Sequence, residues 1–262
     1  MGTVRNLSRL VVGLVLSMVV MASSAFAQQA SALDDIQKRG VLKVGWATVY
    51  PDFYRDAATG GFRGSSFDIV EDLAKTLGVK LELVEDSWAT LVAGIQSGKF
   101  DMTIPSLGIT LPRALAISYS EPVYSNSVGL MIRKQDGERF KTLQDFDKPE
   151  IRLSVTLGSN ADMFLTRAMK SAQILRVKAA PDSIAQLLSN RADAWVSPTQ
   201  SFAKVAAEQT SLAEFTGGNI GDSPIAFGFR AGDYRLKEWL DYYVNELRNT
   251  GQLQQILDRN RQ

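Results

Sequence analysis

The sequence of 262 residues contains neither cysteine nor histidine. Without cysteine the chain forms no disulfide and offers no thiol nucleophile, and without histidine it lacks the commonest general base. The usual ligands of zinc and other transition metals are missing for the same reason. Most hydrolase and metalloenzyme mechanisms therefore lose their key groups, and we expect neither a metal nor a cofactor.

Long apolar runs are lacking beyond the N-terminal segment. That segment carries Arg5 and Arg9 but no acid, continues through an apolar stretch at 10–21, and ends in Ala25-Phe26-Ala27. This order is typical of a secretory signal peptide cleaved after Ala27, which would place the mature protein in the periplasm. A retained membrane anchor is the alternative, but the apolar stretch is shorter than the roughly 20 residues that a membrane span requires. Because the chain has no cysteine, it also has no acceptor for a lipid anchor.

An excess of charge is lacking too. The chain has 29 basic and 28 acidic residues, and removal of the signal peptide takes away two basic residues and no acid. The mature chain then has 27 basic residues against 28 acidic ones, a formal net charge of −1. Nucleic acid is therefore not an expected partner.

Hydrophobic periodicity in the first half of the mature chain alternates between strands and helices. Residues 41–45 and 79–84 have strand patterns, and residues 67–77 place their apolar side chains on one helical face before a glycine ends the helix. A second helix over 91–95 leads into a short strand at 101–104. This β-α-β-α-β series predicts an α/β fold with a mainly parallel sheet covered by helices.

The same series begins again after a charged surface stretch, which indicates a second lobe. Residues 151–156 form the predicted strand, 161–171 the helix and 174–177 the next strand. The C-terminal part predicts a strand at 225–229 and an amphipathic helix that ends near Gly251. We expect this last part to return to the first lobe.

A short sequence similarity relates the two series. Residues 97–101 (SGKFD) precede a strand of the first lobe and residues 189–193 (SNRAD) precede its counterpart, although two five-residue stretches can also be similar by chance. Each strand opens into a loop of small residues, Pro105-Ser106 in one lobe and Ser197-Pro198 in the other. Since ligands collect at the carboxyl ends of parallel strands, we expect these loops to face one cleft.

Several motifs of the first lobe occur in one order. They are GVLKVG at 40–45, YPDF at 50–53, FDI at 67–69, Trp88, SGKFD at 97–101, ITLPR at 109–113 and YSEPVY at 119–124. In this order and spacing they resemble the periplasmic amino-acid-type solute-binding proteins of ATP-driven importers, solute-binding family 3. The second lobe resembles that family more loosely, through LGSN at 157–160, Asp193-Ala194 and residues 249–256.

The resemblance implies the two-lobed α/β fold of a periplasmic binding protein, the Venus-flytrap architecture, with two mainly parallel sheets joined by a two-strand hinge. Lobe 1 would consist of residues 28–124 plus 218–262, and lobe 2 of residues 125–217. The chain would cross between the lobes near residues 123–127 and 215–222. In such proteins the hinge closes on the ligand, because contacts made to both lobes at once stabilise only the closed state.

Arg113 is the first candidate for binding a solute. A guanidinium presents two parallel donors that match a carboxylate, and desolvation in a closed cleft strengthens the pair. Thr110 is a candidate N-cap, with Pro112 in the first helical turn, so backbone donors would favour the same anion. The resemblance places the carboxylate-binding arginine at this position. A salt bridge at the surface or within one lobe is the alternative.

Flat side chains and a small-residue loop complete the predicted first-lobe site. Tyr50 and Trp88 lie where the family stacks its solute between aromatic rings, which can also hold a cation, and core packing is the alternative for both. Ser106 and the amide of Gly108 lie in the loop from which the family donates hydrogen bonds to the carboxylate. Gly108 departs from the hydroxyl residue often found there, so one side-chain donor is missing.

The second lobe is predicted to contribute Ser159, Asn160 and Ser197. Ser159 and Asn160 begin a helix with Asp162 at its fourth position, which resembles a capping box. N-capping is the alternative role for Ser159. Both roles are compatible, because a capped helix end still presents amides to an anion.

Two acids that the resemblance leads us to expect are missing. Many family members place an aspartate near the second-lobe strand end, where it takes the α-ammonium of the solute, but this chain has Ser197-Pro198-Thr199 there. Another family acid is matched by Ala47. A buried ammonium without a carboxylate would cost several kcal/mol. A carboxylate without a primary amine, or with a substituted cation held by aromatic rings, is therefore favoured, unless Asp52 or Glu121 restores an ordinary amino acid.

The predicted function is the capture of a small carboxylate-bearing solute, an amino acid or amino-acid derivative, by the solute-binding subunit of an ABC importer. The implied partners are the membrane permease and ATPase of that importer, and we expect a monomer. A periplasmic lyase or dehydratase on the same scaffold is one alternative, which would need a general acid or base in the cleft. A sensor that presents its solute to a membrane receptor is the other.

Overall fold

The computed structural model describes residues 31–260, so the predicted signal peptide and its cleavage after Ala27 lie outside the described residues. The helices are α2 (Ala32–Arg39), α3 (Ser65–Leu77), α4 (Leu91–Gln96), α5 (Leu111–Ala114), α6 (Asn160–Ala168), α7 (Ala180–Leu188), α8 (Phe202–Glu208), α9 (Tyr234–Asn249) and α10 (Gln252–Arg259), with short 3-10 helices η1 (Lys134–Asp136), η2 (Leu143–Phe146) and η3 (Thr199–Ser201). Within this part of the chain, no helix combines the length and the apolar character needed to cross a membrane.

The strands follow the same chain order. They are β1 (Val41–Trp46), β2 (Tyr54–Arg55), β3 (Phe62–Arg63), β4 (Lys80–Glu85), β5 (Met102–Thr103), β6 (Leu107–Gly108), β7 (Ile117–Tyr119), β8 (Tyr124–Arg133), β9 (Arg152–Thr156), β10 (Gln173–Val177), β11 (Ala194–Pro198), β12 (Leu212–Glu214), β13 (Gly221–Ala226) and β14 (Gly228–Arg230). The β2–β3 pair forms a small separate sheet.

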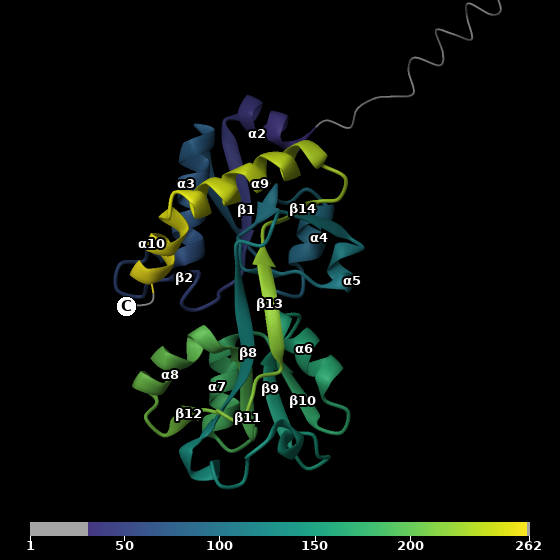
Figure 1. The fold of residues 1–262 in the computed structure, drawn as a ribbon, viewed down its shortest axis with the longest axis vertical. Helices are drawn as coiled ribbons and strands as arrows, with labels where there is room; N and C mark the ends of the chain where they lie inside the picture. Colours follow the sequence, from purple (N-terminus) through teal and green to yellow (C-terminus); the bar gives the residue numbers. More distant parts are fainter. Residues whose placement is uncertain (1–30, 261–262) are drawn as a thin grey trace, which may run out of the picture. The chain divides into compact units, whose positions relative to one another are not determined.

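The first sheet has the strand order β4-β1-β5-β14-β7. β1 is parallel to β4 and β5, whereas β14 is antiparallel to β5 and β7. The predicted β-α-β-α-β series is confirmed, because β1, α3, β4, α4 and β5 follow one another. Helix α3 ends at Gly78, whose left-handed conformation (φ 68°) is adopted at little cost by a residue without a side chain. This sheet and the helices around it are here called the first lobe (Figure 1).

The second sheet has the order β10-β9-β11-β8-β13-β6, and β12 also pairs with β8. β9 lies between β10 and β11 and is parallel to both, as the second predicted series requires. β8 is antiparallel to β11, β12 and β13. Both sheets are therefore mixed, because antiparallel strands extend the three parallel ones of each series. β9 to β12 with α6, α7 and α8 are here called the second lobe.

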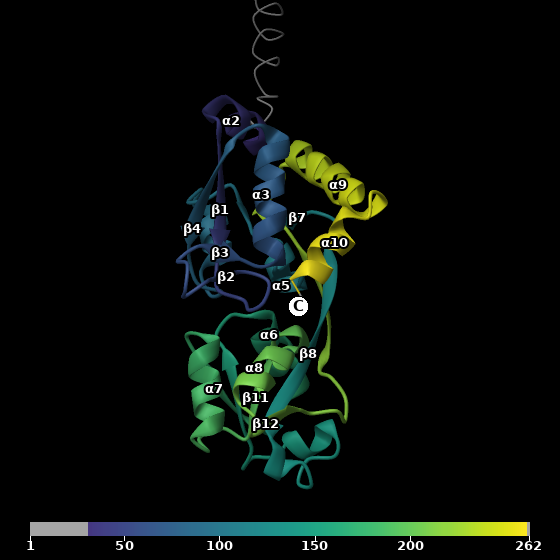
Figure 2. The same ribbon diagram turned by 90° about the vertical axis from the view of Figure 1, so that its left-hand side faces the viewer.

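Two strands connect the lobes. β8 and β13 pair antiparallel from Tyr124, opposite Ile225, to Val128, opposite Gly221. Figures 1 and 2 show the two strands side by side over this stretch. The first predicted crossing, near 123–127, coincides with this pairing, whereas the second, near 215–222, overlaps it only at its C-terminal end.

The single strand predicted at 225–229 is two strands. β13 pairs with β8 and β6 in the second sheet, whereas β14 pairs with β5 and β7 in the first. Phe227 lies between them and is completely buried in the core of the first lobe. A continuous apolar pattern therefore hid the point at which the chain changes sheets.

Each lobe has an apolar core of its own. Helix α9 buries Leu236, Leu240 and Val244 on one face, in a cluster that also contains side chains of α3 and β1. Burial of an aliphatic side chain of this size contributes about 1.5–3 kcal/mol relative to exposure. Helix α9 thus packs on the first lobe. The exact residue boundaries of the lobes stay a prediction.

Candidate functional site

A cavity of about 540 Å³ lies between the two lobes and is lined by residues of both. Six of the eight predicted site residues line it, namely Tyr50, Trp88, Ser106, Ser159, Asn160 and Ser197. The other two, Gly108 and Arg113, contact Asn160 and are not among the lining residues. The structure therefore brings the eight residues together, with Asn160 between the open cavity and the predicted anion donors.

The aromatic wall of the cavity is formed by Tyr50 and Trp88. The indole of Trp88 is half-buried and donates to the carbonyl oxygen of Thr48 at 3.2 Å, so this side chain both lines the cavity and packs against its own lobe. The ring of Tyr50 already faces a cation, because the Nζ of Lys204 lies 4.0 Å from its centroid. The face of Tyr50 predicted to hold a cation of the solute is thus occupied by the protein.

Helix α8 supplies a wall that the sequence analysis missed. Ser201, Lys204, Val205 and Glu208 line the cavity. Their spacing of three and four residues is that of one helical face, and this was the signal that could have revealed them. Lys204 also lies 3.7 Å from Glu208, and the hydroxyl of Ser201 donates to the carbonyl oxygen of Tyr50 at 2.6 Å.

The cavity continues between α7, α8 and β11 to an apolar end. Ile184 and Val205 line this end together with Trp195, whose side chain is only 1% exposed. Among the described residues, the indole N–H of Trp195 has no hydrogen-bond partner. An unpaired buried donor costs free energy, so an acceptor would be stabilised here only where it reaches the indole nitrogen.

Arg113 lies behind the lining residue Asn160, and the part of the cavity next to Asn160 is here called the anion end. Its Nη1 donates to the carbonyl oxygen of Gly108 at 3.0 Å and to Oδ1 of Asn160 at 2.5 Å, and its Nη2 donates to the carbonyl oxygen of Gly158 at 2.6 Å. Burial lowers the pKa of Arg113, although the neighbouring Tyr119 opposes this effect. In the described part of the chain no carboxylate pairs with Arg113, so the alternative of a salt bridge within a lobe finds no support there.

Tyr119 completes this end of the cavity. Its hydroxyl donates to the carbonyl oxygen of Gly108 at 3.3 Å, next to the guanidinium of Arg113. Burial raises the pKa of Tyr119 to about 12, even though the positive charge of Arg113 acts in the opposite direction. The phenol therefore stays neutral at physiological pH, and Arg113 remains the charged group of this end.

The start of helix α6 holds the second-lobe contacts in place. Ser159 is its N-cap, and the hydroxyl of Ser159 accepts from the backbone N–H of Asp162 at 3.2 Å. The predicted capping box is altered, because the Asp162 carboxylate accepts from the N–H of Gly158 at 2.9 Å rather than from that of Ser159. Gly158 has φ 73°, and a Cβ there would lie 2.6 Å from Cα of Ala89 in the first lobe. A glycine at 158 thus permits close approach of the lobes.

The predicted N-cap of the helix beside Arg113 is only partly realised. Thr110 occupies the N-cap position of α5, but its hydroxyl makes no capping hydrogen bond. The hydroxyl instead contacts Sδ of Met163 in the second lobe at 3.7 Å. Thr110 therefore adds a contact between the lobes.

Of the two acids proposed to replace the missing aspartate, only Asp52 lies near the cavity. It accepts from Oγ of Ser65 at 3.0 Å and from the side-chain amide of Gln200, which belongs to the second lobe. Burial raises the pKa of Asp52, although these hydrogen bonds favour the charged form. Glu121 lies elsewhere and pairs with Arg248 at 3.2 Å.

Asp193, from the motif shared with the family, has a structural role. Its carboxylate lies 2.9 Å from Nη1 of Arg139 and accepts from the backbone N–H of Arg152 at 2.9 Å. Burial opposes ionisation, but these partners hold the pKa of Asp193 below its ordinary value. Asp193 therefore fixes the start of β11 and is not available to a solute.

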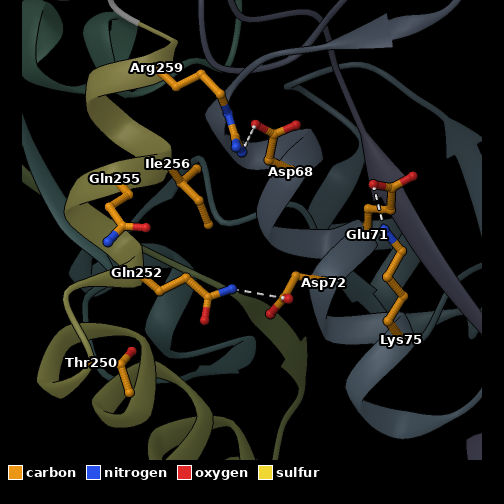
Figure 3. A pocket seen from close by; sticks show the side chains of 9 residues that line it. All are labelled: Asp68, Glu71, Asp72, Lys75, Thr250, Gln252, Gln255, Ile256 and Arg259. Carbon is orange, nitrogen blue, oxygen red and sulfur yellow. Dashed lines mark hydrogen bonds and ion pairs between the residues drawn. The ribbon is translucent and has the colours of Figure 1, made fainter.

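A second cavity of about 520 Å³ lies between α3 and α10 (Figure 3). Its acidic side chains have partners, because Asp68 pairs with Arg259, Glu71 with Lys75, and Asp72 accepts from Gln252. All of its lining residues come from α3 and from the C-terminal part of the chain. A ligand there would touch one lobe only and could not favour closure.

Comparison with known proteins agrees with this architecture. The sequence matches the model of the family described as bacterial extracellular solute-binding proteins, family 3, over residues 42–261. The chain is similar to a cyclohexadienyl dehydratase of Pseudomonas aeruginosa, with 29% identity over 67% of this chain and 66% of that protein. It is also similar to a probable amino-acid ABC transporter periplasmic-binding protein of Sinorhizobium fredii, with 26% identity over 87% of this chain and 79% of the relative.

A solved structure extends the likeness to three dimensions. The chain is similar to an ancestral amino acid-binding protein described as a precursor of cyclohexadienyl dehydratase, with a TM-score of 0.80 and 27% identity over 88% of this chain and 100% of that one. This likeness confirms the predicted two-lobed α/β fold of a periplasmic binding protein. Because the family model covers most of the sequence, the chain belongs to the bacterial extracellular solute-binding proteins, family 3.

Proposed function

We propose that this protein is the extracytoplasmic solute-binding subunit of an ABC importer, exported by a signal peptide that is cleaved after Ala27, and that it captures a small carboxylate-bearing solute. One observation carries the proposal: the cavity is lined by both lobes, and behind its lining residue Asn160 lies a buried guanidinium without an acidic partner among the described residues. A solute that contacts both walls stabilises only the closed arrangement of the lobes. The permease and ATPase of the importer are the implied partners.

The charges around the cavity favour an anion without a primary amine. Arg55 and Lys204 line the cavity, and Arg113 lies behind it, whereas Glu208 is the one acid among the lining residues and is paired with Lys204. Lys204 also covers the ring of Tyr50. An ammonium group on the solute would therefore be repelled by these positive side chains. A carboxylate without an amine, or an amino-acid derivative with a masked amine, is preferred to an ordinary amino acid for this reason.

The apolar end of the cavity favours a solute whose part away from the carboxylate is apolar. Ile184, Val205 and Trp195 enclose the space between α7 and α8. Apolar side chains of this kind gain free energy by burying apolar surface of the ligand, at about 25 cal/mol per Å². The proposed solute thus has a carboxylate head and an apolar body that carries a hydrogen-bond acceptor.

A thermal-shift screen of the mature protein tests this function. The screen compares amino acids, betaines, cyclic amino-acid derivatives, simple carboxylates and, as a control class, neutral sugars. A ligand that binds only the folded state at 100 times its dissociation constant stabilises it by about 2.7 kcal/mol, which raises the melting temperature. Selective stabilisation by carboxylates is expected. Stabilisation by sugars alone, or by no member of any class, would contradict the proposal.

A dehydratase is the second candidate function. Its support is the similarity to a cyclohexadienyl dehydratase and to the precursor of such enzymes. Such a reaction needs a proton donor, and the raised pKa of Asp52 suits that role, but Gln200 of the second lobe covers its carboxyl group. Incubation of the purified protein with a cyclohexadienyl carboxylic acid, with Asp52→Asn as the control, separates catalysis from binding. Turnover that Asp52→Asn abolishes would establish the enzyme.

A further inference from the structure

We infer that Asn160 is a built-in competitor for the solute carboxylate, whose side chain must be displaced before a carboxylate can reach Arg113. The inference rests on the function proposed above, because it concerns the same end of the cavity. Three contacts between the lobes and the missing side chain at Gly108 support it.

The second lobe presents two oxygens to Arg113 in the manner of a carboxylate. Oδ1 of Asn160 lies 2.5 Å from Nη1 of Arg113, and the carbonyl oxygen of Gly158 lies 2.6 Å from its Nη2. Two parallel N–H···O bonds of this kind are the usual geometry by which a guanidinium holds a carboxylate. The same Oδ1 also accepts from the backbone N–H of Gly108 at 3.2 Å. Asn160 thus occupies two of the donors assigned to the solute, Arg113 and the amide of Gly108.

Gly108 provides the space for this arrangement. A Cβ at position 108 would lie 2.1 Å from Nδ2 and 2.3 Å from Cγ of Asn160, which is too close for any side chain to be accommodated without movement. The Asn160 and Arg113 side chains are both buried, at 7% and 6% exposure. Gly108 in the first lobe therefore leaves the space that the side-chain amide of Asn160 in the second lobe fills.

This pair has two consequences for binding. A carboxylate that reaches Arg113 must first break the hydrogen bonds of Asn160, so its affinity is the difference between two similar sets of interactions. The same bonds join the two lobes directly. Removal of the Asn160 amide should therefore strengthen carboxylate binding, which is the opposite of what damage to a binding residue would do.

The experiment compares acetate, the simplest carboxylate, on the mature wild-type protein and on Asn160→Ala and Asn160→Asp. Titrations followed by NMR give the dissociation constants. Asn160→Ala should bind acetate at least about tenfold more tightly, because a charge-assisted hydrogen bond no longer has to be exchanged. Asn160→Asp places a carboxylate of the protein on Arg113 and should abolish the response to acetate.

Two further variants keep the test independent of one substitution. Gly108→Ala pushes the Asn160 side chain out from the other lobe and should change acetate binding in the same direction as Asn160→Ala. Met163→Ala is the matched control, because Met163 lies on the same helix and contacts the first lobe through Thr110, 3.7 Å away, but does not touch Arg113. Its acetate affinity should stay within about twofold of that of the wild type.

The outcomes separate this inference from the proposed function. Equal or weaker acetate binding by Asn160→Ala and Gly108→Ala, including no binding at all, overturns the inference, even where the solute screen succeeds. Tighter acetate binding by both variants supports it. If the screen finds no solute while both variants bind acetate more tightly, the proposed function fails and the role of Asn160 stands.

Discussion

The two ends of the cavity differ in how the protein satisfies its own polar groups. At the anion end, Arg113 and the amide of Gly108 already have acceptors supplied by the second lobe. At the apolar end, the indole N–H of Trp195 has no acceptor among the described residues. A solute therefore exchanges hydrogen bonds at the first end, whereas an acceptor that reaches Trp195 at the second end would add one. The anion end selects the charge of the solute, and the apolar end can add affinity without competition.

The largest expected effect is at the anion end. Arg113→Ala should weaken carboxylate binding by more than about 100-fold, because the solute would then bury a carboxylate without its counter-charge, a cost that the exchange with the neutral Asn160 amide does not offset. The fold should stay intact. Isothermal titration calorimetry measures the affinity, and circular dichroism checks the fold. Arg113→Lys is the control, since it keeps the charge but loses the fork of two donors. Unchanged affinity in Arg113→Ala would remove Arg113 from the site.

The aromatic wall between the two ends should have the next largest effect. Trp88→Ala should weaken solute binding by about 1–3 kcal/mol if the indole stacks on the solute. Calorimetry and thermal denaturation are measured on the same preparation. A lower melting temperature with intact affinity would show that Trp88 acts only as part of the first-lobe core, where it also packs.

Asp52 tests whether the contact between the lobes depends on pH. Burial raises its pKa in the folded protein, so its contribution to stability is complete below the pKa of the unfolded chain, near 4, and is lost as the pH rises through the folded value. Asp52→Asn should therefore raise the free energy of unfolding at neutral pH and remove part of the loss above about pH 4. Denaturant unfolding between pH 4 and pH 8 measures this difference. A variant that is less stable than the wild type at pH 8 would refute it.

The smallest expected effect is at the apolar end. Trp195→Phe keeps an aromatic ring but removes the unpaired donor, and should weaken binding of the screened solute by about 0.5–1.5 kcal/mol without lowering the stability of the free protein. Trp46→Phe is the matched control, because Trp46 is also buried with an unpaired indole N–H but does not line the cavity. If both variants bind the solute as the wild type does, Trp195 only shapes the cavity.

Much of the fold followed from local patterns in the sequence. Both strand–helix series were predicted because parallel strands and their crossover helices have clear periodicities, as in β1, α3 and β4. The boundary between β13 and β14 was not predicted, because both sides of Phe227 are apolar and buried. A change of sheet depends on which strands are neighbours in space, and local periodicity does not contain that information.

The site was predicted unevenly for a similar reason. Tyr50, Trp88 and Arg113 lie in motifs shared with a family, so the resemblance placed them. Lys204 and Glu208 lie on a helix whose polar face is typical of any surface helix, and only its position beside the cavity gives it a role. The contact of Asn160 with Gly108 joins residues 52 positions apart, and no local pattern predicts the distance between two lobes.

Strand β8 runs from the connection between the lobes into the second sheet, so a bend near its start would move the whole second lobe. It runs without interruption from Tyr124 to Arg133, and its first half pairs only with β13, while its second half lies between other strands of the second sheet. We therefore expect bending over the first half, with the rest of the strand moving with its lobe as one rigid arm. A rotation of a few degrees near Tyr124 is magnified with distance along that arm. Substitutions in the β8–β13 ribbon, other than at Asn126, which lines the cavity, should thus tune how far the cavity opens.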